Sequence, residues 1–224
     1  MIALICPTRG RPIQFKKMLE SAFRTAADPK NFWVYYYISE NDPTYEYYPR
    51  LERTSCFRGP DWPTVMCSNY MASHENMDNK DLLMIAADDM VFTTPCWDTA
   101  LLDHYNALEK KQHVYAFQDS RDADGTPHPI ATKEFVAALG YLSCPIFMHW
   151  YIDYWMVEIA KANGCFTHMR DYLLVHEKGS DKGQADETHT RIRKNGTHQR
   201  DTFAHEKMQH LLDMEKCRMN EAMR

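Results

Sequence analysis

The stretch DLLMIAADDMVF, residues 81–92, joins a short apolar run to two adjacent carboxylates, Asp88 and Asp89. A run of this kind is typical of a strand buried inside a sheet. In parallel α/β sheets, ligands bind beyond the carboxyl ends of the strands, because loops and helix N-termini converge there. The sequence therefore predicts a buried strand that brings its two aspartates to a binding edge.

The segments on either side alternate between strand and helix patterns. Further strands are predicted at 2–6, 32–38, 113–118 and 172–176. Helices are predicted at 13–26, after Pro63, from Pro95 with Thr94 as N-cap, at 132–139, up to about Gly164, and as one amphipathic segment from about 202 onward. This order indicates an α/β fold with a Rossmann-like, mostly parallel central sheet, flanking helices and a C-terminal helix.

Composition restricts the class of protein. The 224 residues, 44% hydrophobic and 25% charged, suit one soluble globular domain. No apolar run approaches the roughly 18 residues of a membrane span, so we expect a cytoplasmic protein. The seven cysteines are odd in number and form no CxxC pair, which argues against a disulfide framework.

The charge argues against a broadly basic nucleic-acid binder, since the net value is -5. Residues 189–200 nevertheless contain Arg191, Arg193, Lys194 and Arg200 with no acid among them. This segment is either a solvated face or a local phosphate contact.

The pair Asp88-Asp89 suggests a cation site. Two carboxylates about 5 Å apart repel by about 3 kcal/mol at an effective dielectric near 20, and a divalent cation would remove that penalty. Oxygen ligands suit Mg²⁺ or Mn²⁺. The alternative is that the pair only caps a turn.

Three other segments carry polar groups toward the same edge. In PTRGRP, Thr8, Arg9 and Arg11 could hold a diphosphate, or could be a solvated turn; the loop matches neither GxGxxG nor a Walker motif. In HWYIDYW, Asp153 could act as a general base or cap a helix. His176, at the end of YLLVH, could ligate a metal or be structural.

Taken in order, these residues resemble a GT-A fold glycosyltransferase of the family-2-like kind, in its compact phage and bacterial form. The resemblance runs through PTRGRP (7–12), SENDP (39–43), the helix with Asn69, IAADDMVF (85–92), GTPHPIATKEF (125–135), HWYIDYW (149–155) and VHEKG (175–179). It covers most of the chain up to about residue 190.

The resemblance implies a role for each of these positions. Thr8, Arg9 and Arg11 would hold the nucleotide and its phosphates, Asp42 would contact the base, and Asn69 would line the nucleotide pocket. Asp89 and His176 would bind the metal, with Asp88 on ribose or sugar and Asp153 as catalytic base. The sequence departs from the family motif at Ala87, which stands at its first acidic position.

The resemblance also implies an organisation. Residues 1–200 would form the GT-A domain, with a nucleotide-sugar half at about 1–118 and an acceptor half at about 119–200, and residues 201–224 would form a helix packed on it. Gly179 and Gly183 make the loop after His176 a candidate lid.

The expected activity is metal-dependent, inverting transfer of a sugar from a nucleotide-sugar, a UDP-sugar first, to an acceptor hydroxyl with Mn²⁺ or Mg²⁺ as cofactor. The leading acceptor is a 5-hydroxymethylpyrimidine in phage DNA, which would place the protein in the host cytoplasm; a glycan is the alternative. A nucleotidyltransferase and a non-catalytic nucleotide or carbohydrate binder are alternatives of another class. No membrane partner is indicated.

Overall fold

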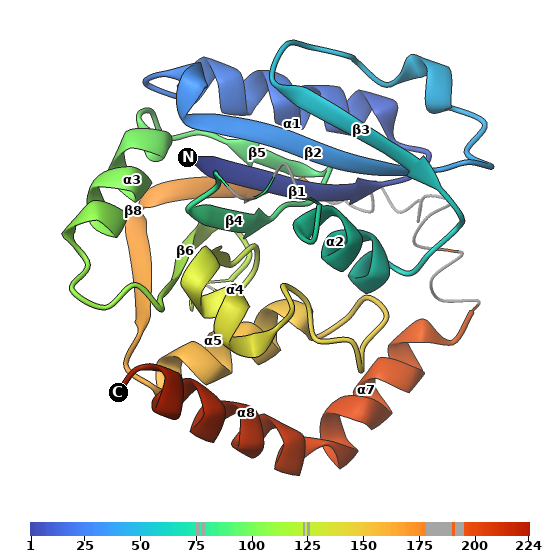
Figure 1. Ribbon diagram of the computed structural model, residues 1–224. Helices are drawn as coiled ribbons and strands as arrows, with labels where there is room; N and C mark the ends of the chain where they lie inside the picture. The colour runs from blue at the N-terminus through green and yellow to red at the C-terminus, as the bar shows by residue number, and fades with distance from the viewer. Residues whose placement is uncertain (75–76, 78, 123, 125, 178–189, 191–194) are drawn as a thin grey trace.

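The computed structural model describes residues 1–224 except 75–76, 78, 123, 125, 178–189 and 191–194. Its strands form one sheet in the order β3-β2-β1-β4-β7-β6-β8-β5 (Figure 1). Their bounds are β1 Ile2–Thr8, β2 Phe32–Ser39, β3 Thr54–Gly59, β4 Leu82–Ile85, β5 Met90–Phe92, β6 Val114–Asp119, β7 Ile130–Thr132 and β8 Phe166–His176.

The sheet is mixed, with parallel pairing in the majority. Strands β3, β2, β1 and β4 are parallel neighbours, as are β6 and β8. Strand β7 is antiparallel to β4 and β6, and β5 is antiparallel to the end of β8. This arrangement confirms the predicted Rossmann-like α/β class.

Helices cover both faces of the sheet (Figure 1). They are α1 Pro12–Thr25, α2 Thr64–Ala72, α3 Trp97–Ala107, α4 Lys133–Leu139, α5 Ile152–Ala162, α7 Thr197–Lys207 and α8 Gln209–Ala222, with short 3-10 turns at Pro29–Asn31 and Tyr45–Tyr47. One core gathers apolar side chains of α1 and α3, and the other gathers those of α2, α4, α5 and α8. Burying both faces explains why the central strands are continuous apolar runs.

Helix α1 illustrates how the sequence determines an element. Pro12 occupies the first helical position, where a missing N–H costs nothing. Phe15, Met18, Leu19 and Ala22 then recur at helical spacing, and all four are buried against the sheet.

Three expectations about elements are wrong. The segment from 202 onward is two helices, α7 and α8, separated at Met208. Helix α3 starts at Trp97 after Cys96, which has a left-handed backbone; the Thr94 hydroxyl instead accepts the amide of Leu173. Strands β3, β5 and β7 were not predicted, because they have only three to six residues and lack a long apolar run.

Two expectations from composition agree with the structure. All seven cysteines are free thiols. Within the described residues, no helix is both long and apolar enough to cross a membrane. The lid glycines, Gly179 and Gly183, and three of the four basic residues of 189–200 lie outside the described residues.

Candidate functional site

A cavity of about 610 Å³ opens where β1, β4, β6 and β8 end. Seven of the nine site residues expected from the sequence line it: Thr8, Arg9, Arg11, Asp88, Asp89, Asp153 and His176. They come together because the carboxyl ends of parallel strands meet at one edge of the sheet. The remaining two, Asp42 and Asn69, do not line this cavity.

Asp88 lies at the centre of a buried polar group that joins the first and fourth strands. Its Oδ2 accepts the hydroxyl of Thr8 at 2.7 Å, and its Oδ1 accepts Nη1 of Arg11 at 2.9 Å. The Tyr48 hydroxyl accepts the backbone amide of Arg11 at 3.0 Å. Thr8 and Arg11 therefore hold Asp88 in place, whereas the sequence predicted that they would hold a diphosphate.

Burial raises the pKa of Asp88 to about 6, although the Arg11 guanidinium acts in the opposite direction. Arg11 Nη1 also lies 3.5 Å from Asp89 Oδ2, so one guanidinium serves both carboxylates. The repulsion between the two aspartates, inferred from the sequence, is offset by a cation of the protein itself.

His176 lies between two carboxylates. Its Nε2 is 3.3 Å from Asp89 Oδ1, and its Nδ1 is 3.6 Å from Asp119 Oδ2. The carboxylates of Asp119 and Asp89 raise the pKa of His176 to about 9. Burial by itself raises the pKa of Asp89 and of Asp119. The neighbouring His176 ring is the largest of the effects that act in the opposite direction, and together these effects keep both pKa values below the ordinary value.

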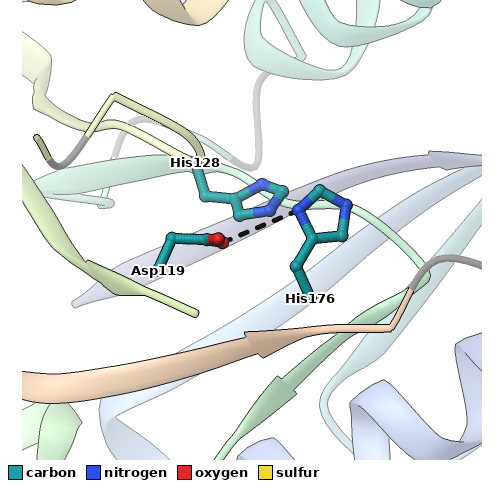
Figure 2. A group of neighbouring side chains, drawn as sticks. All are labelled: Asp119, His128 and His176. Atoms are coloured by element: carbon teal, nitrogen blue, oxygen red, sulfur yellow. Dashed lines mark ion pairs between the residues drawn. The ribbon is translucent and has the colours of Figure 1, made fainter. Parts of the chain in front are cut away.

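His128 completes this cluster, as Figure 2 shows. Its ring centroid lies 5.1 Å from that of His176, and burial, followed by the charge of His176, lowers its pKa to about 4. Its backbone has a positive φ of 55°, which costs a side-chain-bearing residue about 1–2 kcal/mol. Strain of this kind persists where surrounding structure enforces it and is common at functional sites.

Asp119, His128 and His176 offer ligand atoms that all lie within 4.8 Å of one another. His128 Nε2 and Asp119 Oδ2 are buried, and within the described residues neither has a hydrogen-bond partner. Buried polar atoms without partners are rare and costly. Imidazole nitrogens and a carboxylate oxygen are common ligands of divalent transition metals, so these residues fit a cation.

Asp42 and Asn69 lie outside the cavity lining and bind other parts of the chain, and their contacts with a nucleotide stay predictions. Asp42 accepts the amide of Gly10 at 2.8 Å and both the amide and the hydroxyl of Thr44, which ties the loop after β1 to the turn after β2. Asn69 bonds the backbone of Leu142 and Ser143, which fixes the chain after α4. Their polar atoms are engaged by the protein backbone.

Asp61, which the sequence reasoning missed, occupies the cavity wall after β3. It pairs with Arg9 at 2.6 Å and accepts the Ser39 hydroxyl at 3.1 Å. The Trp62 ring stacks on Tyr37, and both rings line the same wall. This wall offers an aromatic surface and a charged pair at the carboxyl ends of β2 and β3.

Asp153 lies in the first turn of α5 and faces the cavity, as the sequence predicted. Burial raises its pKa above the ordinary value. The preceding residues 148–152 also line the cavity. Their backbone is held by Asp201 of α7, which is fully buried and accepts the amides of Met148, His149 and Trp150 at 2.8–3.0 Å.

Two members of the His176 cluster were absent from the sequence predictions. Asp119 follows the apolar run 113–118 directly, so the strand-end rule that selected Asp88 and His176 could have found it. His128 gives no such signal, because it stands in the turn-rich segment TPHP and reaches the cluster only through the position of β7.

No protein-family model matches the chain, and no curated protein matches its sequence. Solved structures do match it. S. aureus TarS, residues 1–349, has 10% identity and a TM-score of 0.58, covering 81% of this chain and 61% of that one. The same protein in complex with UDP-GlcNAc has 11% identity and a TM-score of 0.57, covering 83% of this chain and 61% of that one.

The mannosyltransferase PcManGT from Pyrobaculum calidifontis, in complex with GDP-Man and Mn²⁺, has 12% identity and a TM-score of 0.60, covering 88% of this chain and 61% of that one. The chain thus spans about three fifths of the length of these solved proteins. At such identities the likeness establishes the fold, and this chain has a GT-A-like glycosyltransferase fold.

Replacing Arg11 with Gln should lower the free energy of unfolding by about 3 kcal/mol at pH 8, because it leaves two buried carboxylates without their cation. The loss should shrink at pH 5, below the Asp88 pKa of about 6, where that carboxyl is mostly protonated. Urea unfolding at the two pH values measures both effects.

The matched control is Arg24→Gln, an exposed arginine in the last turn of the same helix α1. Its loss should stay below about 1 kcal/mol at both pH values. Equal losses for Arg11→Gln and Arg24→Gln would contradict the assigned role of Arg11.

Proposed function

We propose that the protein is a nucleotide-sugar-dependent glycosyltransferase that transfers a hexosyl group to an acceptor hydroxyl. The observation that carries this proposal is the content of one cavity in a GT-A-like fold. The cavity combines an arginine-lined wall, a cluster of carboxylates and imidazoles, and the separate, half-buried carboxylate of Asp153. These are the groups that a nucleoside diphosphate, a divalent cation and an acceptor hydroxyl need.

The donor is proposed to lie along the ends of β1, β2 and β3. Arg9, which pairs with Asp61, is the cationic side chain proposed to contact the phosphate there, and Trp62 offers a ring face for the base. Asp61 replaces Asp42 as the acidic group in contact with the nucleoside. A UDP-sugar is the first choice, since TarS has been solved with UDP and with UDP-GlcNAc, although PcManGT holds GDP-Man.

A divalent cation, Mn²⁺ or Mg²⁺, is proposed as cofactor. The residues that would hold it are in the Asp89, Asp119, His128 and His176 group, where Asp119 Oδ2 and His128 Nε2 are buried without a hydrogen bond to the described residues and fit a cation. When bound, the cation supplies positive charge beside the diphosphate leaving group.

Asp153 is proposed as the general base. Its carboxylate accepts the proton of the acceptor hydroxyl while that oxygen forms a bond to the anomeric carbon and the bond from this carbon to the diphosphate oxygen breaks. The raised pKa of Asp153, caused by burial, makes its carboxylate a stronger base than an exposed aspartate. Because the displacement is single and in line, the anomeric configuration inverts.

Charge favours one of the two acceptors. Among the described residues that line the cavity, six are aspartates, three are arginines, and one is His176, whose pKa of about 9 keeps it positively charged at pH 7. The aspartates still outnumber these cations, and a net acidic wall disfavours a polyanion such as DNA and suits a neutral saccharide. We therefore place a glycan acceptor first and keep hydroxymethylated DNA as the alternative to be tested, since Arg191, Arg193 and Lys194 lie outside the described residues.

Replacing Asp153 with Asn should reduce kcat by about 10²–10⁴-fold, because the amide cannot accept the acceptor's proton. Binding of the nucleotide-sugar should be unchanged, since Asp153 is assigned to the acceptor. Released nucleoside diphosphate measures turnover, and isothermal titration measures donor affinity.

Glu158→Gln is the control, since it makes the same chemical change on α5 at a position that does not line the cavity. It should keep wild-type turnover. A wild-type protein that binds nucleotide-sugars and never releases diphosphate would identify a non-catalytic binder, and release of pyrophosphate from a nucleoside triphosphate would identify a nucleotidyltransferase.

A panel of nucleotide-sugars with Mn²⁺ should show diphosphate release that rises when saccharide acceptors are added and does not rise with hydroxymethylcytosine DNA. The acidic cavity wall is the reason for this expected order. Stimulation by the DNA alone would overturn the preference for a glycan. The UDP-sugar arm and the GDP-sugar arm of the same panel test the choice of nucleotide.

A further inference from the structure

The two nitrogens of His176 face different surroundings. On the Nε2 side, Asp89 already lies beside the Arg11 guanidinium, so positive charge is supplied there by the protein. On the Nδ1 side, Asp119 Oδ2 and His128 Nε2 are buried and, within the described part of the chain, without hydrogen-bond partners. The buried polar atoms that lack a hydrogen bond thus lie on the Nδ1 side of the His176 ring.

The backbone of Ile85 lies beside the His128 ring and opposes the lowering of its pKa. The buried Nε2 of the ring has no hydrogen-bond partner among the described residues. Histidines that bind metals usually donate their other N–H to a carbonyl or carboxylate, which fixes the ring and leaves a lone pair toward the ion. Asp89 is the carboxylate partner of His176 in this sense, and it contacts the Nε2 atom of that ring.

We propose that Asp119, His128 and His176 are the three protein ligands of one divalent cation and that Asp89 orients His176. Donors of one ion lie about 3–4 Å apart when each is about 2.1 Å from it. The three ligand atoms lie within 4.8 Å of one another, which is close to that spacing. The inference rests on the proposed function, because that function gives the bound cation its role.

Two imidazoles and one carboxylate differ from the all-oxygen environment that Mg²⁺ prefers. Imidazole suits transition metals, and affinity for nitrogen ligands rises from Mn²⁺ toward Zn²⁺. The site should therefore bind Mn²⁺ at least about tenfold more tightly than Mg²⁺ in the absence of donor. This preference narrows the cofactor choice that the sequence left open.

The test is Mn²⁺ titration of the donor-free protein, followed by the loss of the free-ion EPR signal. Asp119→Asn and His128→Asn should each weaken binding about tenfold or more. Asn suits position 128 because it tolerates a positive φ. Asp89→Asn should weaken Mn²⁺ binding less than either ligand substitution, because its amide oxygen still accepts the N–H of His176.

Pulsed EPR of bound Cu²⁺ counts the coordinated imidazoles, two in the wild type and one in His128→Asn, and thermal melting verifies that each variant folds. Wild-type affinity in His128→Asn, or loss of binding in Asp89→Asn alone, would overturn the inference and leave the proposed transfer intact. Two-imidazole binding in a protein without transfer would support the inference and reject the proposed function.

A second observation concerns Asp201, which no motif identified. Its carboxylate accepts three consecutive backbone amides, those of Met148, His149 and Trp150. The same helix α7 adds the His205 ring, stacked on Tyr151 at 4.5 Å, and the Thr202 hydroxyl, 3.2 Å from that of Tyr151. Residues 148–153 form a continuous part of the cavity wall that ends at Asp153.

We infer that Asp201 is a positioning residue that sets the acceptor side of the cavity through this loop. The inference rests on the proposed function, in which Asp153 is the base. Asp98 provides a matched control: it is also fully buried and accepts three donors, Ala27 N, Asp28 N and Asn31 Nδ2, yet it does not line the cavity.

Asp201→Asn and Asp98→Asn should lower the melting temperature by similar amounts, because each amide substitution leaves buried amides poorly paired. At a temperature where both are folded, only Asp201→Asn should lose about tenfold or more in kcat and raise the acceptor KM, with donor affinity unchanged. Equal kcat in the two variants would overturn the inference.

Hydrogen exchange separates this result from failure of the proposed function. Asp201→Asn should accelerate exchange of the amides of 148–150, and Asp98→Asn should not. If Asp201→Asn accelerates exchange but the wild-type protein shows no transfer, the positioning contact is supported and the proposed transferase function is rejected.

Discussion

The buried ion pair between Arg11 and Asp88 is the interaction on which the cavity depends. It joins the loop after β1 to the turn after β4, two central strands of the sheet; Thr8 donates to Asp88, and Tyr48 bonds both Thr8 and the backbone amide of Arg11. Charges removed from water are stable only when they are paired and fully hydrogen-bonded. The pairing therefore restrains the backbone at the strand ends, and Asp89, next along the chain, is held facing His176.

Several buried aspartates in this fold bind backbone amides and have no direct place in the proposed chemistry. Asp42, Asp98 and Asp201 each accept three donors, most of them backbone amides, and apart from those of Thr44 these donors lie far away in sequence. In sequence they cannot be told apart from Asp89 or Asp153, because the distinction depends on which backbone lies opposite. That is why Asp42 was assigned to a nucleotide and Asp201 was overlooked, although both are nearly or fully buried.

The parts of the fold that could be predicted follow from periodicity. Apolar runs marked β1, β2, β4, β6 and the end of β8, and helical spacing marked α1, so the gathering of Thr8, Arg11, Asp88, Asp89 and His176 at one edge was predictable. Short strands such as β7 carry too few residues for a pattern, and β7 is what brings His128 to the cluster. Whether Arg11 binds a phosphate or a carboxylate depends on distances between side chains. The spacing of residues along the sequence does not determine those distances.

The double pairing of β8 has a consequence for assembly. It runs parallel to β6, with a register shift between Phe117 and Gln118, and its last residues, Leu174 to His176, also pair antiparallel with β5. The cluster thus joins the turn before β5, the end of β6, the segment before β7 and the end of β8, positions up to 87 residues apart in sequence. Contacts over such separations form late in folding, because closing long loops costs entropy before the contacts offset it. Partly folded chains therefore lack this site, and a ligand of the cluster selects the chains in which the last strand has docked.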